Sequence, residues 1–142
     1  MAACMANWSC CPVDRVRLFA IIRVGGRLLE PSEIARLASA AASEKQASDI
    51  IVLDVHASCS FADYFVIASA ENVRQLNAVW EAVMDALKAH GAIPLHKEGT
   101  AESGWLLADY GSVVIHLFAV EEREFYRLEA LWKDAVAVLR ME

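Results

Sequence analysis

The stretch GWLLADYGSVVIHLF, residues 104–118, decides the fold that this sequence predicts. Two apolar runs of strand length flank the Gly-Ser pair at 111–112, which is typical of a tight turn. We therefore expect an antiparallel hairpin. Alternation along the first run predicts that Trp105, Leu107 and Asp109 share one face of the sheet, while the residues between them share the other.

Upstream of the hairpin, the sequence predicts two helices and two strands. An Ala-rich segment at 32–47 has apolar residues at helical spacing, and DIIVLDV (49–55) and DYFVIAS (63–69) follow it. The apolar residues of these two runs do not alternate, which is typical of strands buried on both faces. A second helix is expected over 72–91, with an Asn cap at its start and a Gly at its end.

The remaining elements complete a mixed sheet. Pro94 restricts the segment 93–97 to an edge strand, because proline cannot donate a ladder hydrogen bond. A last helix is expected over 121–140, where three acids open the first turn. Its expected buried stripe is Phe125, Leu128, Trp132, Ala135 and Leu139. The expected fold class is α/β, with a mixed sheet of about five strands covered by helices.

The chain of 142 residues has room for one domain with a single sizeable core. We assign this domain to residues 31–142, because the first 30 residues show no clean periodicity and Pro31 follows them. Residues 1–30 are expected to be a poorly ordered extension, in which VRLFAIIRV (16–24) could form a short strand before a Gly-Gly turn.

Composition limits the partners. The net charge of -6 argues against a protein that grips DNA or RNA through phosphates, so a basic protein is the expected partner. No segment is long and apolar enough to span a bilayer, and the start lacks the basic residues of a secretory signal. We expect a cytoplasmic protein with free thiols; an organellar location is the alternative if residues 1–29 are a targeting segment.

The sequence motifs typical of nucleotide-binding and metal-dependent enzymes are incomplete in this chain. The only Gly pair lacks the Lys of a phosphate-binding loop. Asp49 and Asp54 are five positions apart and fall on opposite faces of a strand, although Asp54 could still meet Asp63 across neighbouring strands. His56 and Cys59 are suitably spaced for zinc but lack further ligands. We therefore expect no metal and no cofactor.

Two further residue sets leave alternatives open. Cys59 with His116 could form a nucleophile pair, but a thiol half-buried in a loop is far more common. His116 is more often a hydrogen-bonded structural residue, and Arg123 and Glu124 are either helix-end or partner contacts. The expectation is a protein that is not an enzyme.

A docking face is the remaining hypothesis. The face that carries Trp105, Leu107 and Asp109, with Glu98 on the preceding loop, offers an aromatic anchor and acids for a basic partner. On the pattern alone, Trp105 is more often a core residue.

Several segments in this order resemble the Iojap, or ribosomal silencing factor, family. They are DIIVLDV, ADYFVIAS, VRQLNAV, KEG, GWLLADYGSVVIHLF and EEREFYRLEALWKDA, and they extend over residues 32–137. The resemblance implies a fold related to the nucleotidyltransferases but without their catalytic acids. It also implies binding to the fourteenth protein of the large ribosomal subunit, which sterically blocks joining of the small subunit and represses translation. Homodimers occur in the family, and organellar relatives act in large-subunit assembly.

The resemblance also assigns residues. The partner-facing Trp of the family falls on Trp105, and its neighbouring acid and hairpin residues fall on Asp109, Tyr110 and Gly111. Glu98 matches the Glu of the family's Glu-Gly pair. One departure is the segment Ala70-Glu71-Asn72, where relatives usually have Gly followed by Thr-Ser, so the helix entry could differ. The alternatives to silencing are a large-subunit assembly factor and a nucleotide-binding enzyme.

Overall fold

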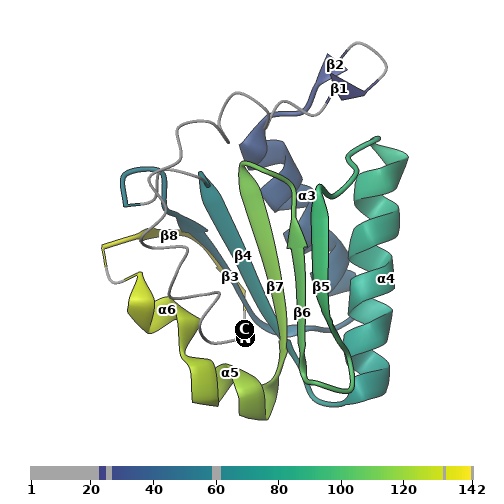
Figure 1. Cartoon of the computed structure of the whole chain (residues 1–142), viewed down its shortest axis with the longest axis vertical. Coiled ribbons are helices and arrows are strands. Elements are labelled where there is room, and N and C mark those ends of the chain that lie inside the picture. The colour runs from purple at the N-terminus through teal and green to yellow at the C-terminus, as the bar shows by residue number, and fades with distance from the viewer. Residues whose placement is uncertain (1–22, 25–26, 59–61, 133, 142) are drawn as a thin grey trace.

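A six-stranded mixed sheet forms the centre of the protein (Figure 1). The computed structural model describes residues 23–24, 27–58, 62–132 and 134–141. The strand order is β5-β6-β7-β4-β3-β8. The strands are β3 (Ser48–Asp54), β4 (Tyr64–Ala70), β5 (His96–Thr100), β6 (Trp105–Asp109), β7 (Val113–Ala119) and β8 (Val136–Met141).

The expected hairpin is confirmed. Strands β6 and β7 pair antiparallel with Trp105 opposite Phe118, and Gly111 in the turn has a φ of 87°, a conformation that favours glycine. Strands β4 and β7 are parallel, so the sheet is mixed as predicted. Nearly every residue of β4 and β7 is buried, as the unbroken apolar runs indicated. The edge position predicted for the strand after Pro94 is confirmed, but β5 covers His96–Thr100 and not 93–97, so Glu98 lies within the strand and not on a loop.

Helices cover both faces of the sheet. Helices α3 (Pro31–Glu44) and α4 (Val73–Ala89) pack on one face, and the short helices α5 (Val120–Tyr126) and α6 (Leu128–Leu131) lie over part of the other (Figure 1). The first core cluster contains the inward residues of α3 and α4 together with Leu106, Ala108 and Tyr110. The second contains Phe65, Trp105, Leu107, Phe118, Leu128 and Trp132. The predicted alternation along β6 is therefore confirmed.

The entry to α4 at Ala70-Glu71-Asn72 is well capped. The side chain of Asn72 accepts a hydrogen bond from the backbone N–H of Gln75 at 2.8 Å. Ala70 is the buried last residue of β4, paired with Ala119, so the chain needs no glycine there. The expected end of this helix is also confirmed, because Gly91 follows it with a φ of 78°.

The predicted helix over 121–140 is wrong in its second half. Arg127 adopts a left-handed conformation with a φ of 43° and separates α5 from α6, and the chain then forms strand β8 against β3. Leu128 and Trp132 are buried as predicted, but Phe125 is 79% exposed. The run VAVLRM pairs with the outer edge of β3, whose buried backbone groups would otherwise lack partners.

Only part of the N-terminal extension is described. A two-residue strand β1 (Arg23–Val24) pairs antiparallel with β2 (Arg27–Leu28). The rest of the strand predicted at 16–24 and the Gly-Gly turn lie outside the described residues, as does Cys59.

Candidate interaction surface

Most of the predicted docking residues are buried. Trp105 is 1% exposed, and Leu107 and Tyr110 are 0% exposed. The prediction that the indole lies open to a partner is therefore wrong for the structure described here. The physical reason is that α5 and α6 fold onto this face. The ring of Tyr126 on α5 lies 6.3 Å from the Trp105 ring, which also packs 6.3 Å from its strand neighbour Phe118.

The turn residues of the hairpin have local contacts. Asp109 accepts a hydrogen bond from the backbone N–H of Gly111 at 2.7 Å, and burial raises the pKa of its carboxyl group. Tyr110 faces α4, where its hydroxyl donates to the sulfur of Met84 at 3.5 Å. Gly111 is itself buried. These contacts stabilise the turn, and a role for the three residues at a partner remains a prediction.

We expect Trp105→Ala to act first on stability. Truncating a buried Trp commonly costs about 3–5 kcal/mol of unfolding free energy. Trp105→Phe should cost much less, because the indole Nε1 has no hydrogen-bond partner among the described residues and its loss breaks no hydrogen bond. Urea denaturation of both variants tests this, and an unchanged midpoint for Trp105→Ala would place the indole at the surface after all.

His116 and Arg123 have structural positions. His116 is fully buried and stacks 6.4 Å from Trp105 and 6.1 Å from Phe118, and burial lowers its pKa to about 3. The guanidinium of Arg123 donates to the hydroxyl of Ser69 at 2.7 Å and also to the carbonyl of Asp49. Arg123 thereby joins α5 to the ends of β3 and β4. Of the two predicted alternatives, these contacts favour the structural one.

The buried imidazole predicts a pH dependence of stability. The unfolded chain takes up a proton at His116 near pH 6.5, whereas the folded chain does so only near pH 3. The stability that the neutral imidazole contributes to the folded state is therefore complete above pH 6.5, and it is lost as the pH falls below that value. The loss should approach ~1.4 kcal/mol per pH unit below that value. Unfolding free energies measured at about pH 7, 6 and 5 should fall less steeply for His116→Phe than for the wild type. Equal slopes would contradict a buried neutral histidine.

Of the residues considered for a zinc site or a nucleophile pair, Cys59 lies outside the described residues. The Asp54 carboxylate lies 2.6 Å from Nδ1 of His56, and this hydrogen bond lowers the pKa of Asp54. Across the described part of the chain, no three His, Cys, Asp or Glu side chains are close enough to hold a metal ion.

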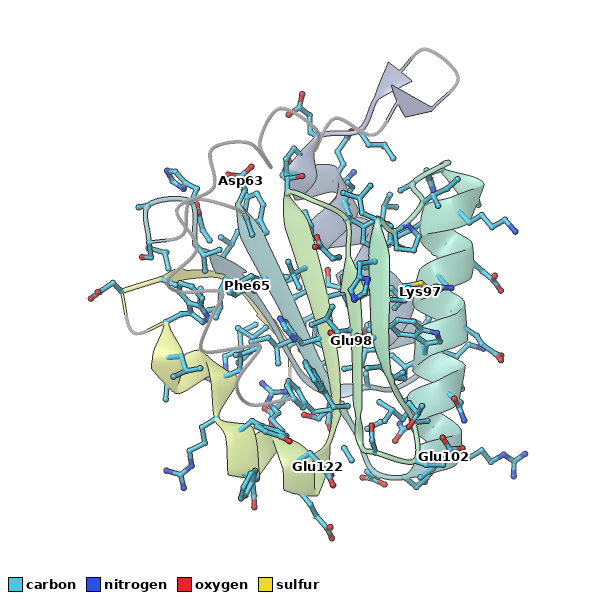
Figure 2. All side chains as sticks on the ribbon, in the orientation of Figure 1. Asp63, Phe65, Lys97, Glu98, Glu102 and Glu122 are labelled. Atoms are coloured by element: carbon cyan, nitrogen blue, oxygen red, sulfur yellow. The ribbon has the colours of Figure 1, made fainter. Side chains whose placement is uncertain are left out.

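The exposed acids gather along one end of the molecule. Glu102 lies in the turn between β5 and β6. The Glu122 side chain approaches Gly104 in the same turn, where a Cβ atom would lie 2.4 Å from the carboxyl carbon of Glu122. Figure 2 shows Glu102 and Glu122 at the same end, with Glu98 higher on the sheet. Helix α5 adds Glu121 and Glu124, both exposed. We call these five glutamates the acidic surface.

Glu98 extends the acidic surface along the edge strand. It lies opposite Leu107 and therefore on the α5 and α6 face, whereas Lys97 lies opposite Ala108 and points toward the α4 side (Figure 2). Its carboxylate is 3.7 Å from Nε2 of the exposed His96. Glu98 is thus a predicted docking residue that the structure leaves clearly accessible. Glu124, for which a partner contact was one of two predicted alternatives, is exposed as well.

Phe125 is an exposed aromatic residue within the acidic surface. Its ring is 79% exposed and packs edge-on against Tyr126 at 5.1 Å. On a helix, Glu121 and Glu122 lie one turn before Phe125 and share its side of α5. The sequence-based prediction placed Phe125 in the core, yet neighbouring residues point about 100° apart on a helix, so only one of the Phe125-Tyr126 pair could face the sheet.

Comparison with known proteins identifies the family. The profile described as "Ribosomal silencing factor during starvation" matches residues 29–142. The chain belongs to this family. The ribosomal silencing factor of Bacillus subtilis is 36% identical over 107 residues, which cover 75% of this chain and 91% of that protein. A crystal structure from Chromobacterium violaceum has a TM-score of 0.71 at 33% identity and covers 74% of this chain and 88% of its own.

An organellar protein is also similar. The mouse protein named "Mitochondrial assembly of ribosomal large subunit protein 1" is 38% identical over 92 residues, which are 63% of this chain and 40% of that protein. These similarities confirm the expected family of ribosomal silencing factors and the expected α/β fold, with six strands instead of about five. None of the described helices has the length and apolar character needed to cross a membrane.

Proposed function

We propose that this chain silences ribosomes in the cytoplasm by binding the fourteenth protein of the large subunit and sterically blocking the small subunit. It does so without catalysis and without a cofactor. The observation that carries the proposal is the match of the silencing-factor family over the whole α/β domain, residues 29–142. Several relatives bear the name ribosomal silencing factor, among them the protein from Bacillus subtilis.

The acidic surface supports a basic partner. A cluster of carboxylates on one protein attracts a basic patch on another, which accelerates the association of the two proteins. The same cluster repels partners whose surfaces are acidic. An exposed aromatic ring rimmed by acids can supply the apolar anchor of such an interface. Phe125 has this position, and Glu98 and Glu102 extend the charge along the sheet edge. Trp105 and Leu107 pack beneath this surface, whereas Tyr110 packs on the α4 side of the sheet. All three support the β6–β7 hairpin from within the core.

A role in large-subunit assembly is the second candidate, and the name of the mouse relative favours it. The two roles differ in the cell. After depletion, immature large subunits should accumulate if the chain assists assembly, whereas excess translation during starvation should appear if it silences. A nucleotide-binding activity is a weaker alternative, and calorimetry with nucleoside triphosphates and magnesium should show no heat.

Binding should depend on Phe125 and on the acids around it. Truncating an aromatic anchor commonly costs about 2 kcal/mol, so Phe125→Ala should bind purified large subunits roughly 30-fold more weakly. The ring is 79% exposed, so its loss should leave the unfolding midpoint almost unchanged. The double charge reversal Glu102→Lys with Glu122→Lys should also weaken binding and alter its dependence on salt.

Two matched variants control for general effects. Leu95→Ala removes another exposed apolar side chain, and Asp85→Lys reverses an exposed acid on α4. Both should co-sediment with large subunits as the wild type does. If Phe125→Ala and the double reversal also sediment like the wild type, the acidic surface is not the docking site.

A further inference from the structure

The two end strands of the sheet, β5 and β8, differ in how they are protected. Strand β5 presents exposed His96, Lys97 and Glu98, and charges of this kind discourage an edge strand from pairing with a further strand. Strand β8 has the sequence VAVLRM, with one charged residue near its end. Among the described strands it pairs only with β3, so the N–H and C=O groups of its outer side face away from the sheet.

Strand β8 also leaves apolar side chains uncovered. Val136 is 67% exposed and Val138 is 58% exposed. Val138 and Leu139 line a groove of about 260 Å³ that runs between the edge of the sheet and the first turns of α3. Val52 and Ala35 belong to the apolar lining of this groove. An open strand edge beside an apolar groove can accept a further strand, through main-chain hydrogen bonds and through side chains that fill the groove.

Residues 16–22 of this chain, VRLFAII, have the sequence of such a strand. They lie outside the described residues and before the part of the chain that matches the family. Their β-branched and aromatic side chains favour extended backbone. Alternation gives a strand over this segment one side that is wholly apolar, which suits the groove, and it places Arg17 on the other side. The apolar side consists of Val16, Leu18, Ala20 and Ile22.

The described start of the chain leads this segment to the groove. Strands β1 and β2 pair with Arg23 opposite Leu28, so the chain doubles back and Arg23 lies beside the residues that enter α3. Leu28 precedes Ser32, which lines the groove, by four residues, and four residues span at most about 14 Å. Seven extended residues span about 23 Å, so residues 16–22 are long enough to follow all six residues of β8.

The position of α3 also fixes the direction of the segment. Asp54 pairs with Val136 at the start of β8, and Asp54 and Ser32 line a common pocket. The start of α3 therefore lies near the Val136 end of β8. A segment that leads into Arg23 and follows β8 has to run toward that end, whereas β8 runs away from it, so the two strands are antiparallel.

We propose that residues 16–22 pair antiparallel with β8 as a seventh strand of the sheet and bury their apolar side in the groove beside α3. The segment belongs to the same chain as its docking site, so its effective concentration there is about millimolar and exceeds that of a free strand in dilute solution. The pairing covers the apolar edge of β8, and Arg17 contributes a charge to the new edge.

This docking goes beyond the proposed function and does not depend on it. Strand β8 is separated from β5 by the four other strands of the sheet. A strand on β8 therefore leaves Glu98 and Glu102 of the acidic surface open to a partner.

Hydrogen–deuterium exchange of the full chain tests the proposal. The variant Ala20→Pro with Ile21→Pro should exchange about tenfold or more faster than the wild type in residues 16–22 and 136–141. Neighbouring residues of a strand direct their N–H groups to opposite sides, so one of the two substituted residues has to donate to β8, and proline cannot donate.

Matched variants control for general effects. Ala6→Pro with Asn7→Pro places the same substitutions before the segment and should exchange like the wild type in both regions. Val138→Lys places an ammonium group in the groove and should accelerate exchange in residues 16–22. Val73→Lys, at an exposed valine that begins α4, should not. Circular dichroism confirms that each variant is folded.

The same exchange at about 1 and 100 µM protein distinguishes the source of the strand. Equal protection at both concentrations supports pairing within one chain, whereas protection that rises with concentration would mean that a second copy supplies the strand and would overturn the proposal. Residues 16–22 that exchange in the wild type as fast as unstructured chain would overturn it too, as would a β8 indifferent to the proline pair. Failure of the wild type to co-sediment with large subunits would count against the proposed function alone.

Discussion

The parallel pairing of β4 with β7 at the centre of the sheet is the constraint on which the rest of the structure depends. Seven residue pairs, from Tyr64 with Val113 to Ala70 with Ala119, align these strands, and nearly all of their side chains are buried. A sheet with such a centre needs apolar cover on both faces. Helices α3 and α4 cover one, and the short α5 and α6 contribute to the other.

This double cover determines where function can lie. The face of Trp105, Leu107 and His116 becomes core, and the stacked His116 stays neutral because charging it there is costly. Arg123 anchors α5 to the strand ends, so the helix that closes the face also presents its acids and Phe125 outward. The side chains that a partner can reach therefore lie at the edges of the sheet, in the β5–β6 turn and on the outer side of α5.

Periodicity and turn chemistry predicted much of this fold. The hairpin around Gly111, the Asn72 cap, the edge position of β5 and the faces of β6 all follow from short-range rules and are confirmed. The prediction of a helix over 121–140 was wrong in its second half because VAVLRM forms hydrogen bonds with β3, which is distant in the sequence. Helical spacing within the segment cannot reveal that pairing. The prediction that Trp105 is exposed was wrong for a related reason. Alternation along a strand tells which residues share a face of the sheet, but not which other element covers that face.

We propose that the partner docks on the acidic surface around Phe125 and not on the helix-covered face. Hydrogen–deuterium exchange of the chain, alone and bound to purified large subunits, tests it most directly. We predict slower exchange on binding in residues 96–104 and 120–126, with α3 and α4 unchanged. Protection confined to α3 and α4, with residues 96–104 and 120–126 exchanging as in the free protein, would show that the partner docks elsewhere.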